Sequence, residues 1–452
     1  MSEDRGPKIQ TISVSEKHVK ARIAAFILAF IVALAAFVNG FLSIGNTKEG
    51  YYDLIAEKDA DAPYYAAGIT YTCLFEGSRG EVRSAVREAD AAYSRALSWA
   101  YKLCDAEKEY DGYINLATIN RVMREQAEEK ISRMLSSQAP LSSDFSGKDS
   151  SSGEKSLQDG VVLSADGERV SFELAEELYS ALRYAYRYTG LGAGYDLFAG
   201  PVYSEWKDII YSEDPQLYDP LNDSSMAERL EMLASLSADF SQFNLSFNDE
   251  DHSVSVKIPT AVYISLDALE SDAPLIDFGA LHDAFMIEML LSRLDMSGPF
   301  GKGVVKTNDG LELDLRTNSV YLALDRRTGE NAAGEGAYRL IKRTDGGEWE
   351  LSGVHASSYE IASSAGSGTL RRDLFFDEYS GSPGSYVSEY YALYEKETRI
   401  DTESHELAFM LFKMLSAASA ADGESVDSRQ QALRSLAPKS ASSSHIVMEY
   451  AQ

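Results

Sequence analysis

The longest apolar stretch of the chain lies near its N-terminus and runs from Ile23 to Ile44. It carries no charged residue, and Asn39 and Ser43 are its polar interruptions. A helix over these positions would be about 33 Å long at about 1.5 Å per residue, and the hydrocarbon core of a bilayer is about 30 Å thick. The pattern therefore predicts a transmembrane anchor over residues 23–44.

The charges on either side of this stretch predict its orientation. After it, up to position 61, the basic residues are Lys48 and Lys58, which stand among several acidic ones. Before it come five basic residues, namely Arg5, Lys8, Lys17, Lys20 and Arg22. Because basic flanks stay on the cytoplasmic side, we expect residues 1–22 inside, 45–63 as a tether and 64–452 as an extracytoplasmic domain. A cleaved signal peptide has a shorter apolar core and a small-residue cleavage site, so the sequence favours an uncleaved, single-pass anchor in the cell membrane.

Beyond the tether, strand and helix periodicities alternate. Residues 66–75 (AAGITYTCLF) predict a strand, and residues 243–258 predict a hairpin because apolar and polar positions alternate on both sides of NDEDHS. A helix is predicted where apolar residues recur at steps of three or four, at Val82, Val86, Ala89, Tyr93, Leu97, Ala100 and Cys104. The other expected elements are helices near 171–188, 282–294, 403–416 and 429–436, and a closing strand at 445–450 (HIVMEY).

The order of these elements predicts the fold class. Helices and strands are mixed without the regular strand–helix–strand alternation of a doubly wound fold, so we expect an α+β domain with mixed sheets and packed helices. A Ser-rich segment near 136–160 is predicted to be an insertion or loop within this domain.

Charge and cysteine usage exclude some classes of function. The net charge of −29 repels polyanions, so we expect no nucleic-acid partner. The two cysteines, Cys73 and Cys104, are too few for a zinc cluster or an iron–sulfur site. We expect two free, buried thiols on a strand and a helix, and a disulfide stays open as the alternative for an extracytoplasmic domain.

Short segments along the domain follow the order of the motifs of a known enzyme family. Residues 66–72 (AAGITYT) open the series, and residues 194–202 (GYDLFAGPV) and 276–285 (IDFGALHDAF) follow. Residues 374–383 (LFFDEYSGSP) and 400–411 (IDTESHELAFML) complete it. Together they resemble the motifs of the FAD:protein FMN transferases, the ApbE family, over the whole extracytoplasmic part.

The resemblance implies a fold, an activity and a set of site residues. Members of the family bind FAD, use Mg²⁺ and transfer FMN to a Thr or Ser hydroxyl of a partner protein. For this chain it implies a flavinylated or redox membrane protein as the partner. Metal ligands are implied at Asp401, His405 and His282. Cofactor-binding positions are implied at Asp196, Gly200, Asp277, Gly279, Asp377 and Gly381.

One departure from the family concerns the metal. His405 stands where the family has a threonine that shares the metal with the aspartate matched by Asp401. If both lie on one helix face at i and i+4, they can converge. Imidazole is a poor ligand for Mg²⁺ and suits a transition metal better. The simpler interpretation is that His405 makes an ordinary hydrogen bond.

Other departures concern the flavin and the transfer step. The family lysine is Asp283 here, which reverses a charge worth about 4 kcal/mol at 4 Å and an effective dielectric constant near 20. The family histidine that is a candidate base is Leu374, which cannot accept a proton. We therefore expect a membrane-anchored ApbE-like protein with weak or lost activity. The alternatives are a non-catalytic binding or scaffold subunit with the same fold and, outside the family, a sensor or adhesion domain.

Overall fold

The computed structural model describes most of the domain that follows the tether. The described residues are 49–58, 68–137, 155–189, 191, 195–238, 242–307, 311–324, 340–343, 349–352, 359–362, 369–372, 390–395, 402–419 and 445–450. None of the helices in these ranges combines the length and the hydropathy needed to cross a bilayer. The anchor expected at 23–44 and the helix expected at 429–436 lie outside the described residues and stay predictions.

The chain divides into two compact units, of which the second holds nearly all the elements described below. The first unit comprises residues 1–50 and 75–87. Within it, the first turn of a helix is capped locally, because the Glu81 carboxylate accepts hydrogen bonds from the Ser78 N–H at 2.9 Å and the Ser78 hydroxyl at 2.6 Å.

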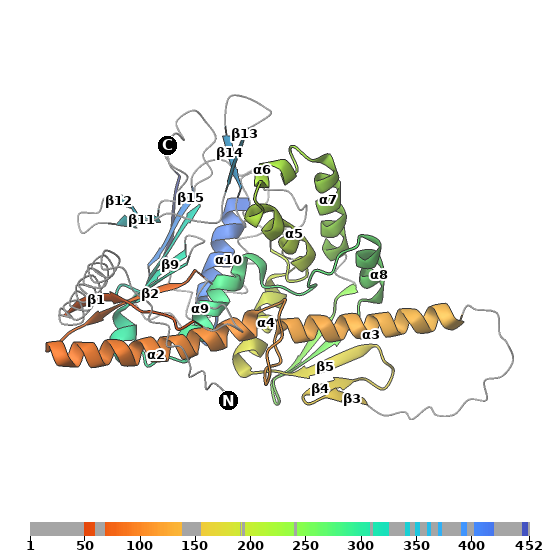
Figure 1. Ribbon diagram of the computed structural model, residues 1–452, viewed down its shortest axis with the longest axis horizontal. Helices are drawn as coiled ribbons and strands as arrows, with labels where there is room; N and C mark the ends of the chain where they lie inside the picture. Colours follow the sequence, from red (N-terminus) through yellow and green to blue (C-terminus); the bar gives the residue numbers. More distant parts are fainter. Residues whose placement is uncertain are drawn as a thin grey trace, which may run out of the picture. The chain divides into compact units, whose positions relative to one another are not determined.

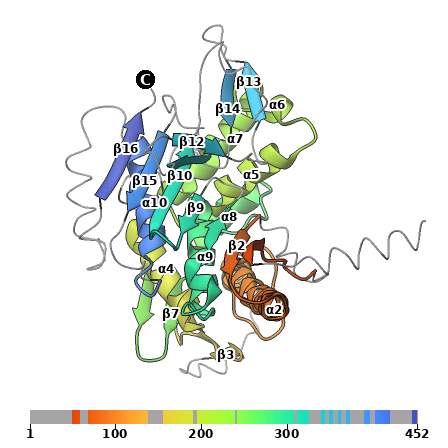
Figure 2. The ribbon, with the colours of Figure 1, turned by 90° about the vertical axis from the view of Figure 1, so that its left-hand side faces the viewer.

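The larger sheet has seven strands in the order β1-β2-β8-β9-β10-β15-β16. Its strands are β1 (Gly50–Asp53), β2 (Thr70–Phe75), β8 (Val304–Lys306), β9 (Leu311–Asp314), β10 (Ser319–Leu324), β15 (Tyr390–Glu395) and β16 (His445–Tyr450). From β2 to β16 neighbouring strands pair antiparallel. Figure 2 shows β10, β15 and β16 side by side. The expected closing strand is confirmed as β16, and the strand expected from residue 66 is described from Thr70 onward.

The second sheet has five antiparallel strands in the order β3-β4-β5-β7-β6. Its strands are β3 (Lys155–Gln158), β4 (Val161–Leu163), β5 (Arg169–Glu173), β6 (Leu245–Asn248) and β7 (Ser253–Lys257). The hairpin expected over 243–258 is confirmed. The helix expected from Ser171 begins five residues later, because residues 171–173 continue β5 and pair with β7. Two further hairpins are β11 (Leu340–Arg343) with β12 (Trp349–Ser352) and β13 (Tyr359–Ala362) with β14 (Thr369–Arg372).

Helices are the other regular elements of the described structure. They are α2 (Arg79–Cys104), α3 (Leu116–Ser137), α4 (Glu176–Tyr188), α5 (Gly200–Tyr211), α6 (Pro215–Tyr218), α7 (Ser224–Ala238), α8 (Thr260–Ala268), α9 (His282–Ser292) and α10 (Glu406–Ser419), with short 3-10 turns η3 (Gly279–Leu281) and η4 (Pro299–Lys302). Figure 1 shows α5, α6 and α7 gathered together, and α9 and α10 pack against each other. The α+β class is therefore confirmed, whereas the strand pairs described above are antiparallel where mixed sheets were expected.

The core of the second unit is apolar and aromatic. In α9 every side chain from Ala284 to Leu291 is buried. Cys73 on β2 and Cys104 at the end of α2 are free and buried, as predicted. Burial raises the pKa of the Cys73 thiol to about 12, so this thiol stays protonated and unreactive at neutral pH.

Candidate functional site

Two of the segments that carry the family resemblance lie against each other. The Asp277 N–H donates to the Leu197 carbonyl at 3.1 Å. Gly200 begins α5, and a Cβ atom at this position would lie 2.3 Å from the Pro274 carbonyl oxygen. Only glycine allows so close an approach between backbones. Residues 195–201 and 274–283, which we call the paired segments, therefore form one local structure.

Asp277 and Gly279 shape the turn that leads into α9. One carboxylate oxygen of Asp277 accepts the Gly279 N–H at 2.9 Å, and Asp277 is only 4% exposed. Gly279 has a φ of 51°, a left-handed conformation that favours glycine. The sequence Asp-x-Gly is thus what this turn requires, and η3 and α9 follow directly.

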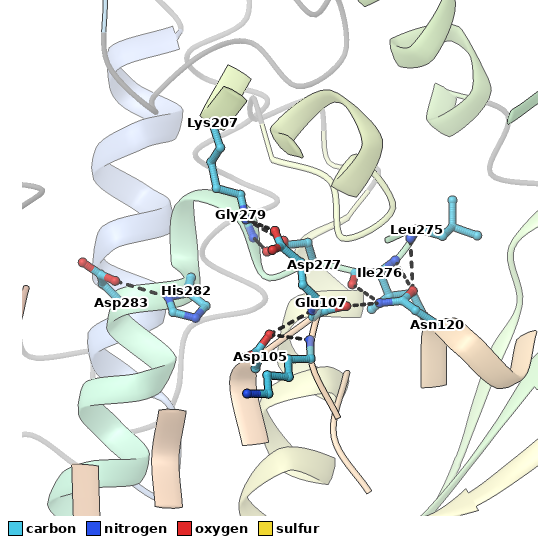
Figure 3. A network of polar contacts seen from close by, with 12 residues as sticks. Asp105, Glu107, Asn120, Lys207, Leu275, Ile276, Asp277, Gly279, His282 and Asp283 are labelled. Carbon is cyan, nitrogen blue, oxygen red and sulfur yellow. Dashed lines mark hydrogen bonds and ion pairs between the residues drawn. The ribbon is translucent and has the colours of Figure 1, made fainter. Parts of the chain in front are cut away.

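Lys207 on α5 neutralises Asp277 from the other side. Its ammonium lies 3.0 Å from a Glu107 carboxylate oxygen and 3.7 Å from the second oxygen of Asp277. Figure 3 shows Lys207 extending from its helix toward Asp277. Burial by itself lowers the pKa of Lys207, but the carboxylates of Asp277 and Glu107 outweigh this effect and raise it. Lys207 is therefore a permanent cation at physiological pH.

Two further side chains hold the backbone around this cluster (Figure 3). The Asn120 amide oxygen accepts the Leu275 and Ile276 N–H groups at 3.1 and 2.8 Å, and its nitrogen donates to the Ile276 carbonyl at 2.8 Å. An Asp105 oxygen accepts the Glu107 N–H at 2.9 Å. Asn120 thus fixes the approach to Asp277, and Asp105 fixes the loop that carries Glu107.

His282 and Asp283 open α9 and interact with each other. The His282 Nδ1 atom lies 3.3 Å from an Asp283 carboxylate oxygen. Burial lowers the pKa of His282, but Asp283 and then Asp277 outweigh it, so the pKa is raised. The carboxylate at the position of the family lysine is therefore paired with the adjacent histidine.

His405 lies beside α9, but not on a helix face. It has a φ of 50° and precedes α10, which begins at Glu406. The helix expected from about residue 403 begins three residues later, because residues 402–405 form turns, so His405 is not on it. The convergence of Asp401 with His405 stays a prediction. Asp401, Asp377 and Gly381 lie outside the described residues.

The partner of His405 is Glu288, a fully buried carboxylate on α9. Its Oε2 atom lies 2.6 Å from His405 Nδ1, and its Oε1 atom accepts the N–H groups of Leu407 and Ala408 at 2.7 and 3.1 Å. Those N–H groups belong to the first turn of α10, where backbone N–H groups have no acceptor within their own helix. The simpler interpretation of His405 as a hydrogen-bonding residue agrees with this geometry, and Glu288 caps α10 from the neighbouring helix.

Asp196 is buried at the start of the other paired segment. It is 1% exposed, and its Oδ1 atom accepts the Phe198 N–H at 2.9 Å. Burial raises the pKa of Asp196 to about 7, against the smaller opposing effects of the hydrogen bonds with Phe198 and Ser237. The folded protein therefore holds this proton far more tightly than the unfolded chain does.

The Asp196→Asn variant is expected to be more stable than the wild type above pH 7 and to lose this advantage near pH 4. Below the ordinary value of 3.8 the carboxyl is protonated in both states, and between about 4 and 7 only the unfolded chain releases the proton. The free energy of unfolding of the wild type is therefore lowered as the pH rises from about 4 to 7, by a total on the order of 4 kcal/mol. Urea unfolding at pH 5 and pH 8 measures the difference.

A matched control should show the opposite sign. Asp251 is exposed, and its hydrogen bond with Ser253 lowers its pKa, so Asp251→Asn should lose stability at neutral pH. A constant difference between Asp196→Asn and wild type at both pH values would contradict the buried, protonated carboxyl.

The described residues do not by themselves assemble a Mg²⁺ site, and Asp401, the aspartate that the resemblance implies as a metal ligand, lies outside them. Within the described part of the chain, no group of three or more His, Cys, Asp or Glu side chains is arranged to hold a metal. Asp277 already uses both oxygens, one for the Gly279 N–H and one for Lys207. Mg²⁺ requires octahedral oxygen coordination. The pyrophosphate of FAD would have to compete with Glu107 and Asp277 for Lys207. Lys207 is therefore already paired and is not a ready cation for FAD.

Sequence reasoning missed four residues of this region, namely Glu107, Asn120, Lys207 and Glu288. Glu288 left a signal, because it is the one charge in the apolar run AFMIEMLL at 284–291 and such a carboxylate needs partners when buried. The other three left none, because their partners are distant in sequence.

Comparison with known proteins gives one match. No protein-family model matches the chain, and no curated protein matches it. Among solved structures, the chain is similar to the crystal structure of the ApbE protein from Thermotoga maritima, which it matches over 89% of this chain and 97% of that chain, at 10% identity and a TM-score of 0.40. A similarity of this degree shows neither the family nor the function.

Proposed function

We propose that this chain is a membrane-anchored relative of the FAD:protein FMN transferases in which transfer of FMN from FAD is weak or lost. Its anchor is residues 23–44, and its domain lies outside the cytoplasmic membrane, where a redox or flavinylated membrane protein is its partner. The family function implies FAD as the ligand. The alternative, if no transfer activity remains, is a non-catalytic binding or scaffold subunit with the same fold.

The observation that carries the proposal is the packing of the paired segments. They are distant in sequence, yet the Asp277 N–H bonds to Leu197 and Gly200 meets Pro274. The residues that match the family in these segments are the ones on which this junction depends. This supports descent from a framework in which the two motifs build one site.

The charges at the junction support weak or lost activity. Asp277 is paired with Lys207, and Asp283 contacts His282 at the position of the family lysine. A carboxylate repels the phosphates of a dinucleotide where the family has an attracting cation. Leu374 also offers no group that accepts a proton.

Restoring the family charge is expected to strengthen FAD binding. In Asp283→Lys a carboxylate becomes an ammonium, and at an effective dielectric constant near 20 even part of this change corresponds to at least about a tenfold lower Kd. Quenching of flavin fluorescence on titration of the purified full-length protein measures Kd. Asp272→Lys is the matched control, because it makes the same charge change at a fully exposed carboxylate and should leave Kd nearly unchanged.

Catalysis is tested separately, by AMP release from FAD with Mg²⁺ or Mn²⁺. We expect no release above the rate of the buffer from the wild type. Steady, metal-dependent AMP release would contradict the loss of activity and establish a transferase. Equal FAD affinity in wild type, Asp283→Lys and Asp272→Lys would argue against a flavin site at the paired segments.

A further inference from the structure

The environment of Lys207 differs from that of an ordinary surface lysine. Its ammonium lies within 3.0 Å of Glu107 and 3.7 Å of Asp277, and it stands 5.1 Å from the centre of the Tyr203 ring. Only 27% of its side-chain surface is exposed. The ammonium is therefore held on several sides at once, by two carboxylates and an aromatic face.

Of the two carboxylates that contact Lys207, Asp277 is fixed directly, and Glu107, whose side chain is 61% exposed, is carried by a fixed stretch of backbone. Asp277 is 4% exposed and anchored by the Gly279 N–H. The Asp105 carboxylate accepts the N–H groups of Glu107 and Lys108, both at 2.9 Å. The loop that presents Glu107 is therefore set independently of any ligand.

The local charge balance requires a cation at this place. Asp105, Glu107, Asp277 and Asp208 all act on Lys207 or lie beside it, and Asp283 is next to His282. Without the ammonium, the buried Asp277 carboxylate would lose its neighbouring positive charge, and Glu107 would add negative charge nearby. Removing one partner of a buried ion pair is strongly destabilising for this reason.

We propose that Lys207 is the resident cation of Asp277 and Glu107, and that it balances the charge of these carboxylates in the place where a divalent metal could otherwise bind them. The site is then complete without Mg²⁺, and its carboxylates are not available as metal ligands. This inference rests on the proposed function for the expectation of a metal, whereas the assignment of Lys207 rests on the geometry alone.

Thermal unfolding of the full-length protein in EDTA, Mg²⁺ or Mn²⁺, at equal ionic strength, tests the inference. The wild-type Tm should not respond to the divalent ions. Lys207→Met keeps most of the stem and removes the charge, so its Tm should fall by about 3 °C or more. Divalent ions should restore part of this loss by binding between the freed carboxylates.

Two variants serve as controls. Lys207→Arg keeps the positive charge and should stay close to wild type without divalent ions. Lys130→Met removes another lysine of similar exposure that pairs at 2.6 Å with Glu168, a carboxylate that is 47% exposed. Because no buried carboxylate loses its partner there, this variant should shift Tm much less.

Two results would overturn the inference. One is a rise in wild-type Tm with Mn²⁺ that Asp277→Asn abolishes, because the metal would then use the carboxylate assigned to Lys207. The other is a Lys207→Met variant as stable as wild type. If Lys207→Met does not fold, the effect of Mn²⁺ on the Tm of wild type and of Asp277→Asn still tests the inference. None of these measurements uses flavin, so they fail or succeed independently of the FAD experiments.

Discussion

Replacing Gly200 by alanine is expected to lower the free energy of unfolding by about 3 kcal/mol or more. The new Cβ atom would lie 2.3 Å from the Pro274 carbonyl oxygen and 3.0 Å from that of Leu275. Both neighbours are backbone atoms, so no side chain can rotate away. The paired segments must separate, which also strains the Asp277–Leu197 hydrogen bond. Urea unfolding followed by circular dichroism measures the loss.

The control for this variant is another glycine in a helix. Gly80 lies in α2, and a Cβ atom there would meet nothing within 4 Å. Gly80→Ala should therefore be neutral or stabilise by up to about 1 kcal/mol, since alanine is the better helix former. If Gly200→Ala were as stable as Gly80→Ala, the two segments would not touch as described, and the support for a shared site would be lost.

Replacing Glu288 by leucine is expected to cost about 3–5 kcal/mol. Leucine leaves three buried donors without their acceptor, namely His405 Nδ1 and the N–H groups of Leu407 and Ala408. Glu288→Gln should cost less, about 1–3 kcal/mol. Its amide oxygen can still accept the two backbone groups, and the neutral imidazole can turn Nδ1 into an acceptor.

The same substitution at the surface separates this effect from the general cost of replacing a glutamate. Glu125 pairs with Arg121 at 2.8 Å, and both side chains are well exposed. Glu125→Leu should therefore change stability by no more than about 1 kcal/mol. Equal effects of Glu288→Leu and Glu125→Leu, measured by urea unfolding, would show that Glu288 does not cap α10.

Local periodicity was enough to predict several elements. The hairpin of β6 and β7, the helices α2, α9 and α10 and the strand β16 all follow patterns that are complete within their own segment. The start of α4 was misplaced because residues 171–173 belong to β5, in which Val170 and Phe172 are buried in alternation. Pairing with β7 makes these residues a strand and not the start of a helix. This pairing depends on tertiary structure, which the local sequence does not show.

Two of the helices that were missed, α3 and α5, carry signals that compete with a helix. α5 begins with Gly-Pro, two residues that commonly mark a turn, yet proline in the first turn is compatible with a helix because its nitrogen needs no partner there. α3 carries many charged residues and a weak apolar stripe. In both cases packing against the rest of the domain stabilises a helix that the local sequence alone does not favour.

The candidate site was predicted only in part, for a similar reason. Asp277 and Gly279 stand in a short motif, and the turn they form could be expected from it. Lys207 and Glu107 are separated by 100 residues, and Asn120 and Ile276 by 156. No pattern within a segment indicates such pairs. The polar network that sets the chemistry of the region therefore needed the folded structure.

The most direct test of the central claim is a crystal structure of the protein grown in millimolar Mn²⁺, with an anomalous difference map. The account predicts the Lys207 ammonium between Glu107 and Asp277 and no anomalous peak beside either carboxylate. A manganese peak on Asp277, with Lys207 turned away, would contradict it.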